Sequence, residues 1–396
     1  MIRFIARRWL LIVSLVVFAF VLAACGGAPP VTSWPGYTIR ENTAYLTSAN
    51  QLIAVELGGD TAGVQLVGWP VQTPNPALGY YTTPALALDG KTLYVGTEQT
   101  NGNSGQVQAW VNVERGTQAA PSMKWTYPLT TTDYIPGNIY GAIALSDGAL
   151  YFGDGKGMVF AVNAEDGRPF WPLPFPTGAR IWSSVVVDDQ NVYAASQSHV
   201  LYAINKKSGK QVWQFPSNES ANIDALVGSP TVYEGTVYVG SFGGVLYAVD
   251  AATGQLKWSF KAEGGLWDGP AWLDGTLYFG DQAGNVYALD AATGQDKKWS
   301  VKVDGGVKMT PLVKNGIVYV GTDRDLMYAF KADTGQSVWA APYKTHDGES
   351  LMVTPDVYST TLVVLPNLAG GTPTRLYGLN MNTGQALWQY PAKQQN

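Results

Sequence analysis

The chain has 396 residues, which suits two or three ordinary domains or one repeated architecture. Apolar residues make up 46% and charged residues only 14%, and glycine and tryptophan are plentiful, a composition typical of many short strands joined by glycine turns. The net charge of −5, without a run of Lys or Arg, argues against nucleic-acid binding. One cysteine excludes intrachain disulfides, and two histidines leave little for zinc or iron.

The N-terminal residues 1–24 have the pattern of a secretory signal peptide. A basic stretch ending at Arg8 precedes sixteen residues, Trp9 to Ala24, with a single polar member. This apolar run is short for a membrane span. The following Leu22-Ala-Ala-Cys25 resembles the lipobox of bacterial lipoproteins, which implies lipidation of Cys25. The alternative is an uncleaved signal anchor with an incidental cysteine.

Residues 25–36 are expected to form a flexible tether after the lipidated Cys25. Acyl chains on this cysteine would hold the protein on a membrane while the polypeptide stays in water. Gly26 stands where an aspartate is associated with inner-membrane retention. We therefore expect the outer membrane, facing the periplasm, in a cell with two membranes, and otherwise the outer face of the cytoplasmic membrane.

The rest of the chain consists of repeated units, each ending in a tryptophan. The best-preserved unit runs from Ala248 through Asp250 and Thr253-Gly254 to Trp258. The closing tryptophans are Trp69, Trp125, Trp171, Trp213, Trp258, Trp299, Trp339 and Trp388. They lie 40 to 56 residues apart, which is the range of a propeller blade. Eight units would fill residues 37–396.

Each unit predicts four antiparallel strands. In the unit ending at Trp258, strands are expected at about 229–233, 236–240, 245–250 and 256–260, separated by turns that contain glycine. Eight such units without helical periodicity predict an all-β, eight-bladed β-propeller of four-stranded antiparallel blades. The tryptophans are expected on the fourth strand, packed between neighbouring blades, with each indole N–H bonded to a carbonyl.

The repeat Ala-x-Asp-x-x-Thr-Gly-x-x-x-Trp resembles the tryptophan-docking repeat of propellers that are similar to those binding pyrroloquinoline quinone (PQQ). Two kinds of protein share this repeat. Quinoprotein alcohol dehydrogenases hold the quinone and Ca²⁺, whereas BamB-like lipoproteins are binding scaffolds in outer-membrane protein assembly. The lipobox, the short tether and the single ring are similar to the second kind.

The sequence offers little for catalysis. The resemblance to a quinoprotein would imply adjacent cysteines, but Cys25 is alone. Ca²⁺ would need converging oxygen ligands, and nothing in the spacing brings the loop acids Asp224, Asp268, Asp281, Asp323 and Asp325 together. Gly153 to Gly157 is interpreted as a turn rather than a phosphate loop, and His199 and His346 as surface residues. No metal, catalytic residue or cofactor is therefore expected, neither PQQ nor Ca²⁺.

A candidate binding rim precedes the first strand of each unit. In a propeller this connection lies at the opening of the central channel. The predicted rim contains Tyr81, Tyr140, Arg180, Trp182, Trp267, Asp268, Lys308, Met309 and Met352. Aromatic residues, Met and Arg are enriched in protein-binding surfaces. The alternative is that some of these side chains pack between blades.

These features predict a lipid-anchored, non-catalytic scaffold outside the cytoplasm. Its expected partners are other envelope proteins or extended peptides, with a membrane contact through the lipid and no nucleic acid, and the protein is expected to be a monomer within a complex. The alternatives are a redox enzyme that binds PQQ or another quinone, and a sensor that binds a small ligand in the channel.

Overall fold

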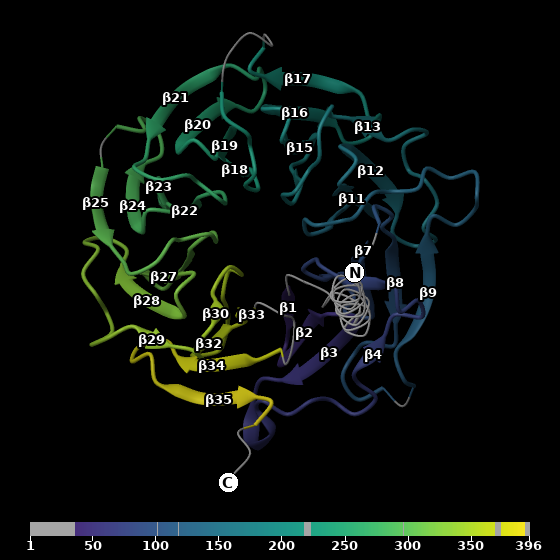
Figure 1. Ribbon diagram of the computed structural model, residues 1–396, viewed down its shortest axis with the longest axis horizontal. Helices are drawn as coiled ribbons and strands as arrows, with labels where there is room; N and C mark the ends of the chain where they lie inside the picture. Colours follow the sequence, from purple (N-terminus) through teal and green to yellow (C-terminus); the bar gives the residue numbers. More distant parts are fainter. Residues whose placement is uncertain are drawn as a thin grey trace, which may run out of the picture.

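The computed structural model describes residues 36–392 except positions 101, 118, 218–222, 296 and 369–373. In this part of the chain, eight antiparallel sheets stand around a central axis and close into a ring (Figure 1). The predicted all-β, eight-bladed propeller is thereby confirmed. Among the described residues the single helical element is a 3-10 turn, η1 (Gly59–Thr61).

The blades are numbered in chain order, and each is built from one continuous stretch of sequence. Blades 1 and 2 contain β1 (Tyr37–Arg40), β2 (Thr43–Ser48), β3 (Gln51–Glu56) and β4 (Val71–Gln72), then β5 (Leu78–Tyr80), β6 (Ala85–Leu86), β7 (Thr92–Gln99), β8 (Val107–Val111) and β9 (Ser122–Tyr127). Blades 3 and 4 contain β10 (Ala144–Ser146), β11 (Ala149–Gly153), β12 (Met158–Asn163) and β13 (Phe175–Pro176), then β14 (Val186–Val187), β15 (Asn191–Ser196), β16 (Val200–Asn205) and β17 (Gln211–Phe215).

The second half of the ring follows the same plan. Blades 5 and 6 contain β18 (Thr231–Tyr233), β19 (Thr236–Gly240), β20 (Val245–Asp250) and β21 (Leu256–Lys261), then β22 (Ala271–Leu273), β23 (Thr276–Gly280), β24 (Asn285–Asp290) and β25 (Lys297–Lys302). Blades 7 and 8 contain β26 (Leu312–Lys314), β27 (Ile317–Gly321), β28 (Leu326–Lys331) and β29 (Tyr343–Lys344), then β31 (Asp356–Tyr358), β32 (Thr361–Val364), β34 (Leu376–Asn380) and β35 (Ala386–Tyr390). A small ladder of β30 (Glu349–Ser350) and β33 (Asn367–Leu368) adjoins blade 8.

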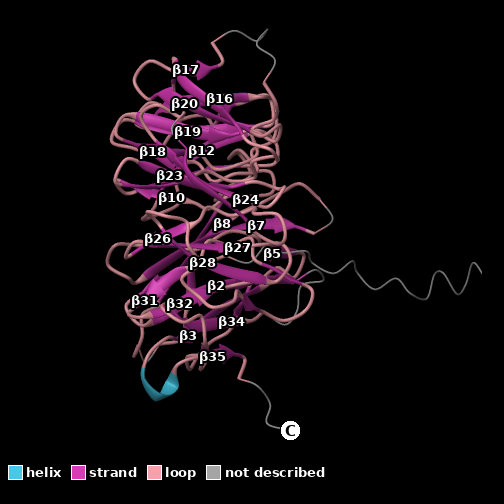
Figure 2. Ribbon diagram, turned by 90° about the vertical axis from the view of Figure 1, so that its left-hand side faces the viewer, coloured by secondary structure: helices cyan, strands magenta, loops and turns pink. Residues whose placement is uncertain are grey.

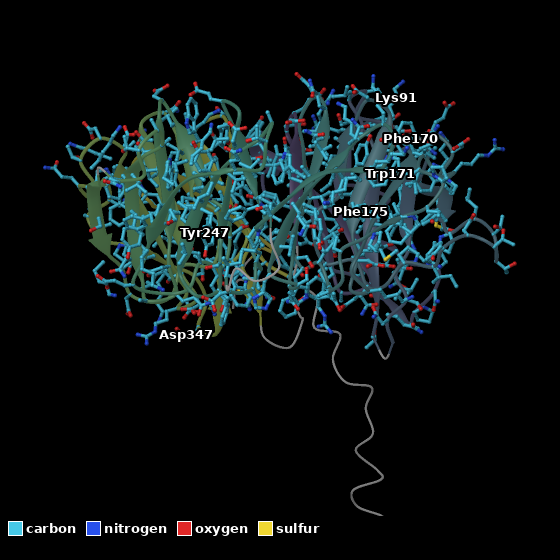
Figure 3. All side chains as sticks on the ribbon, turned by 90° about the horizontal axis from the view of Figure 1, so that it is seen from above. Lys91, Phe170, Trp171, Phe175, Tyr247 and Asp347 are labelled. Carbon is cyan, nitrogen blue, oxygen red and sulfur yellow. The ribbon has the colours of Figure 1, made fainter. Side chains whose placement is uncertain are left out.

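Each blade runs from the axis outwards. The first strands face the channel and the fourth strands, such as β9, β21, β25 and β35, form the outer wall (Figure 1). Seen from the side, the ring is a thick disc (Figure 2). Figure 3 shows Lys91, in the turn between the first and second strands of blade 2, on one face, and Asp347, in the connection into blade 8, on the other. We call this second face the rim face.

The Thr-Gly turn between the third and fourth strands is set by its own residues. In blade 5 the Asp250 carboxylate accepts hydrogen bonds from the backbone N–H and the hydroxyl of Thr253, both at 2.9 Å. Gly254 has a φ of 74°, and a Cβ there would lie 2.8 Å from the ring of Trp213 in blade 4. Glycine is therefore required both for the turn and for close contact with the neighbouring blade.

The tryptophans contact the next blade around most of the ring. In blades 2 to 7 the indole N–H donates to a turn carbonyl of the following blade at 2.8–3.1 Å, as Trp213 does to Ala251 and Trp339 to Met381. Trp69 is also buried, whereas Trp258 and Trp388 are only partly buried. The tryptophans thus fill the spaces between blades.

A second aromatic set was not singled out from the sequence. A tyrosine stands at the same place in the second strand of blades 1 to 7, at positions Tyr45, Tyr94, Tyr151, Tyr193, Tyr238, Tyr278 and Tyr319. Each lies 5.7–6.0 Å, centroid to centroid, from the tryptophan of its own blade, and its hydroxyl donates to a carbonyl of the next blade. This tyrosine recurs in every unit except the last, and its recurrence could have identified the set from the sequence.

Three tryptophans do not lie on the fourth strand, contrary to expectation. Trp69, Trp171 and Trp339 precede the two-residue strands β4, β13 and β29. In blade 3, Pro172 and Pro174 follow the tryptophan, and proline cannot donate to a strand ladder. The segment therefore leaves the sheet, although the Trp171 indole still donates to the Lys206 carbonyl at 2.9 Å.

The ring is closed by side chains between blades 8 and 1. The Tyr37 hydroxyl in β1 donates to the Val363 carbonyl in β32 at 2.7 Å, and the Tyr390 hydroxyl donates to the Gln65 side chain at 2.7 Å. Each blade pairs its own strands, and the described residues show no strand exchange across this junction. Closure therefore rests on the same kind of packing as the other blade contacts.

Candidate functional site: the channel rim

One register position in each of blades 2 to 8 faces the channel. In blades 2 to 7, one residue of the first strand pairs with the second-strand tyrosine, and in blade 8 the corresponding residue pairs with Val363. We define the rim position of a blade as the residue four places before this first-strand residue. In blades 2 to 8 these residues are Tyr81, Tyr140, Trp182, Val227, Trp267, Lys308 and Met352. All seven line one cavity of about 450 Å³, together with Tyr37 of blade 1. The residue immediately before each is at most 1% exposed.

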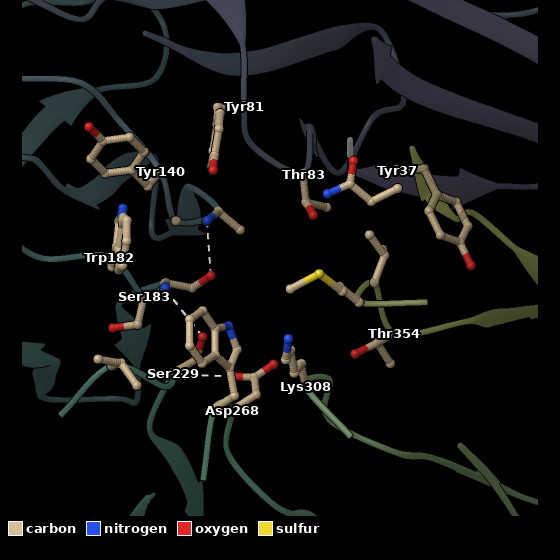
Figure 4. Close-up of a pocket in the computed structure, with 18 of the residues that line it drawn as sticks. Tyr37, Tyr81, Thr83, Tyr140, Trp182, Ser183, Ser229, Asp268, Lys308 and Thr354 are labelled. Atoms are coloured by element: carbon tan, nitrogen blue, oxygen red, sulfur yellow. Dashed lines mark hydrogen bonds between the residues drawn. The ribbon is translucent and has the colours of Figure 1, made fainter. Parts of the chain in front are cut away.

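The aromatic members form a continuous arc around the cavity, which Figure 4 shows in part. Ring centroids are 5.2 Å apart for Tyr81 and Tyr140, 6.0 Å for Tyr140 and Trp182, and 6.4 Å for Trp182 and Trp267. Phe242, in the turn between β19 and β20, lies 6.0 Å from Trp267 and is 50% exposed. We call these five residues the aromatic arc. The small Val227 of blade 5 stands between its two tryptophans in the order of the blades.

Two cations accompany the arc. The Arg180 guanidinium lies 6.0 Å from the centroid of the Trp182 ring, and the Lys308 ammonium lies 5.7 Å from that of Trp267. Lys308 also forms a salt bridge of 3.0 Å with Asp323. Arg180 is exposed and does not line the cavity itself. The site is therefore an aromatic wall with positive charge at two of its tryptophans.

Asp268 lines the cavity, but its carboxylate holds blades together. It accepts hydrogen bonds from the backbone N–H groups of Ser229 in blade 5 (3.0 Å), Gly269 in its own blade (2.9 Å) and Thr310 in blade 7 (3.2 Å). Burial raises the pKa of Asp268, although these hydrogen bonds oppose the shift. Its oxygens are therefore occupied within the fold rather than presented to a ligand.

Hydroxyl groups continue this blade-to-blade connection around the channel. The bonds run from Ala142 N to Ser184 Oγ (2.9 Å), from Ser184 N to Ser229 Oγ (3.2 Å) and from Thr354 Oγ1 to Thr310 O (2.9 Å). These residues follow the rim positions by two places in blades 3, 4, 5, 7 and 8. They fix the loop backbones, so the rim side chains are carried on a rigid support.

Glu98 is a half-buried carboxylate near the start of the arc. It lies in β7, and burial raises its pKa to about 7. Burial also raises the pKa of Tyr81, and the charge of Glu98 adds to that shift. The surroundings of Glu98 and Tyr81 therefore disfavour negative charge.

Replacing Glu98 with glutamine is expected to remove a pH dependence of stability. Because the folded-state pKa lies above the ordinary value of 4.5, this group stabilises the fold fully below that pH, and the contribution is lost as the pH rises through about 7. Urea denaturation midpoints should thus fall more for the wild type than for Glu98→Gln between about pH 5 and pH 8. Equal changes in the two proteins would contradict the raised pKa.

One sequence expectation needs correction. Met309 does not belong to the rim: it is 2% exposed, packs in the core between blades 6 and 7, and lies one place after the rim position. Arg180 lies beside the rim residue Trp182, next to the cavity. Sequence reasoning also missed Val227, Tyr37 and Phe242. Val227 could have been found from the strand register, whereas Tyr37 lies in the strand β1 and Phe242 stands in a turn.

The described acidic side chains of the loops do not converge into a metal site. Among the described residues no group of three His, Cys, Asp or Glu side chains could hold a metal ion. Two of the loop acids accept hydrogen bonds within the fold. Asp281 accepts them from the backbone N–H groups of Gly264 and Asn285, and Asp323 accepts one from the Gly306 N–H. His199 contacts the Ile223 carbonyl at an exposed turn.

The signal peptide, Cys25 and the tether lie outside the described residues except Gly36, so the proposed lipidation has no structural account here. Within the described part of the chain, no helix has both the length and the apolar character needed to span a bilayer.

A family model described as "Outer membrane protein assembly factor BamB" matches residues 103–262, 155–297 and 243–396. Together these ranges cover well over half of the chain. No curated protein matches the chain significantly.

Several solved structures have the same fold. BamB from Moraxella catarrhalis is 16% identical with a TM-score of 0.63, covering 87% of this chain and 93% of that one. The computationally designed protein Ika8 is 14% identical with a TM-score of 0.66 and coverages of 90% and 98%. The quinohemoprotein alcohol dehydrogenase ADHIIG from Pseudomonas putida HK5 is 14% identical with a TM-score of 0.63 and coverages of 92% and 78%. At these identities the likeness shows the fold alone.

Proposed function

Because the chain belongs to the family of the outer membrane protein assembly factor BamB, we propose that it is a non-catalytic scaffold that binds other envelope proteins through its channel rim. A lipid on Cys25 would hold it on the membrane: the outer membrane, facing the periplasm, in a cell with two membranes, or the outer face of the cytoplasmic membrane otherwise. Its partners are protein surfaces or extended peptides, and it acts as a monomer within a complex.

The observation that carries this proposal is the exposure of the aromatic arc. The docking tryptophans fill the spaces between blades, whereas Trp182 is 37% and Phe242 50% exposed. Large aromatic side chains on a rigid support, with Arg180 and Met352 beside them, have the composition of protein-binding hot spots. The exposed parts of the Trp182 and Phe242 rings can therefore contact a partner.

A second candidate function is the binding of a small ligand in the channel. The volume of about 450 Å³ supports it, because small-molecule sites span roughly 300–1,000 Å³. Mass spectrometry of protein released from native membranes distinguishes the two: a stoichiometric small molecule favours a sensor, and captured proteins favour the scaffold.

Replacing both Trp182 and Trp267 with alanine is expected to weaken partner binding at least tenfold. Each aromatic hot spot contributes about 2 kcal/mol or more. The measurement is affinity capture from detergent-solubilised native membranes, with partners found on the wild type quantified on the variant. Full capture by a folded variant would move the binding surface away from the rim.

Two controls separate binding from folding and anchoring. Thermal unfolding of the double variant should show a much smaller loss than removal of a docking tryptophan, because both rim residues are partly exposed. Cys25→Ser should release the protein from membranes, or leave its precursor uncleaved, while the rim stays intact. Membrane attachment with continued acyl labelling in Cys25→Ser would contradict the lipid anchor.

A further inference from the structure

The junction between blades 8 and 1 lacks a pair of hydrogen bonds that holds most of the other blades together. In blades 2 to 7, the second-strand tyrosine hydroxyl and the tryptophan indole N–H both donate to the turn between the third and fourth strands of the next blade. At the junction of blades 4 and 5, Tyr193 and Trp213 share the Ala251 carbonyl. Blade 8 has Val363 in place of the tyrosine, and among the described residues the Trp388 N–H has no acceptor. We call this junction the seam.

The turn of blade 1 that faces the seam is not bound by a backbone or indole donor of blade 8. Leu57 is the counterpart of Ala251: each directly follows the third strand of its blade, and its N–H donates to the carbonyl before the second strand, at 2.7 and 3.0 Å. In the described chain, no group of blade 8 donates to the Leu57 carbonyl. The Trp388 ring still lies against this turn, but it is only partly buried. The centre of the seam is therefore closed by apolar packing.

The hydrogen bonds that do cross the seam lie at its margins. Of the two tyrosine hydroxyl bonds that close the ring, one comes from the first strand β1 and the other from the fourth strand β35. A third contact joins the hydroxyl groups of Ser48 and Thr374. Separating blades 8 and 1 therefore breaks none of the central tyrosine and tryptophan bonds that hold blades 2 to 8 to one another, and a local opening requires least free energy here.

The seam is also the part of the channel wall that faces the aromatic arc. Tyr37 of blade 1 lines the cavity, as do Met352 and Thr354 of blade 8. Figure 4 shows Tyr37 and Thr354 across the cavity from Tyr140 and Trp182. We propose that the ring opens at the seam, and that this opening widens the channel site so that an extended segment of a partner protein can enter it.

The size of the closed cavity gives this opening its role. A volume of about 450 Å³ lies within the range of small-molecule sites. A protein segment that contacts the whole aromatic arc needs more room. Movement of one blade relative to the next provides that room without breaking strand pairs, because each blade pairs only its own strands in the described chain. This role rests on the proposed function of the rim, whereas the opening itself does not.

Two matched cysteine variants test the opening without any partner. Val55 in β3 packs in the cluster between blades 8 and 1, and Val249 in β20 packs in the cluster between blades 4 and 5. Both side chains are 0% exposed, and each valine directly follows the alanine of its third strand. Each is replaced with cysteine in the full chain, and its modification by a maleimide under native conditions is followed by peptide mass spectrometry, which separates it from Cys25. We expect Val55→Cys to react at least about tenfold faster than Val249→Cys. Equal rates would overturn the proposal.

The dependence of these rates on urea separates a local opening from global unfolding. A local opening exposes little surface, so the Val55→Cys rate should change little at low urea concentrations, whereas a reaction through the unfolded chain accelerates with urea. We expect this acceleration for Val249→Cys alone. The same steep rise in both variants would overturn the proposal, because both thiols would then react only from the unfolded chain.

A reversible crosslink tests whether the opening admits partners. In the double variant Ser48→Cys and Thr374→Cys, the two thiols replace hydroxyl groups that are in contact, and their disulfide holds blades 1 and 8 together. Partner capture should be at least about tenfold weaker for the oxidised form than for the reduced form of the same protein. Equal capture by the two forms would overturn the role of the seam in partner entry. Absence of capture by the reduced form and by the wild type would contradict the proposed function alone, because the thiol rates measure the opening without a partner.

Discussion

Replacing Trp339 with alanine is expected to lower the free energy of unfolding by about 3–5 kcal/mol, the range for large buried aromatic residues. The side chain is 3% exposed and lies against Gly384 of blade 8, and its indole N–H donates to the Met381 carbonyl at 2.8 Å. Truncation opens a cavity between blades 7 and 8 and removes one of the two donors to that carbonyl. Denaturation followed by circular dichroism gives the change in midpoint.

Two comparisons test the physical cause. Trp339→Phe keeps most of the apolar area but loses the indole donor. It should therefore cost less than Trp339→Ala: about 1 kcal/mol for the lost hydrogen bond, plus the cost of a smaller cavity. Trp258→Ala should also cost less, because Trp258 is only partly buried. An unchanged midpoint in Trp339→Ala would mean that the tryptophans do not hold neighbouring blades together.

Replacing Asp268 with alanine is expected to cost about 2–4 kcal/mol, because backbone donors of three blades lose their acceptor. The N–H groups of Ser229 and Thr310 belong to blades 5 and 7, so the loss should loosen both junctions of blade 6. The measurement is again the denaturation midpoint. A change no larger than that of Trp182→Ala would show that the carboxylate is not a structural connection.

The variant Asp268→Asn separates charge from hydrogen bonding. Burial raises the pKa of Asp268 above its ordinary value of 3.8. The group therefore contributes fully to stability below about pH 3.8, and this contribution is lost as the pH rises through the pKa of the folded state. The wild type should therefore gain stability relative to Asp268→Asn as the pH falls from about 7 to about 4. A constant difference would mean that the carboxyl titrates alike in the folded and unfolded chain.

The channel rim could be predicted only in part. The rim residues Tyr81, Tyr140 and Trp182 follow from the fixed distance between the connection and the first strand, a local property. The prediction for Met309 was wrong because consecutive residues of this loop alternate between the channel and the core. Lys308 lines the cavity, whereas Met309, the next residue, is buried. The apolar character of Met309 does not reveal whether its side chain faces the channel or the core.

The role of Asp268 was beyond the sequence for a different reason. Its acceptor contacts join residues 39 and 42 positions away, in the preceding and the following blade. No pattern within one repeat states that a loop carboxylate will meet these donors, because their approach depends on how the blades are packed around the axis. The same holds for Phe242, which contacts Trp267 across a blade junction.

The sequence by itself determined the number of blades, the strand order within each and the contact between blades. Eight copies of the turn and the tryptophan, as in Thr253-Gly254 and Trp258, specify local hairpins whose large aromatic faces must be covered by the next copy. The tertiary structure decided which rim side chains face the channel, where a fourth strand is shortened to two residues, and which acids are bound into the fold. These depend on contacts between residues far apart in the chain, which form only when the ring closes.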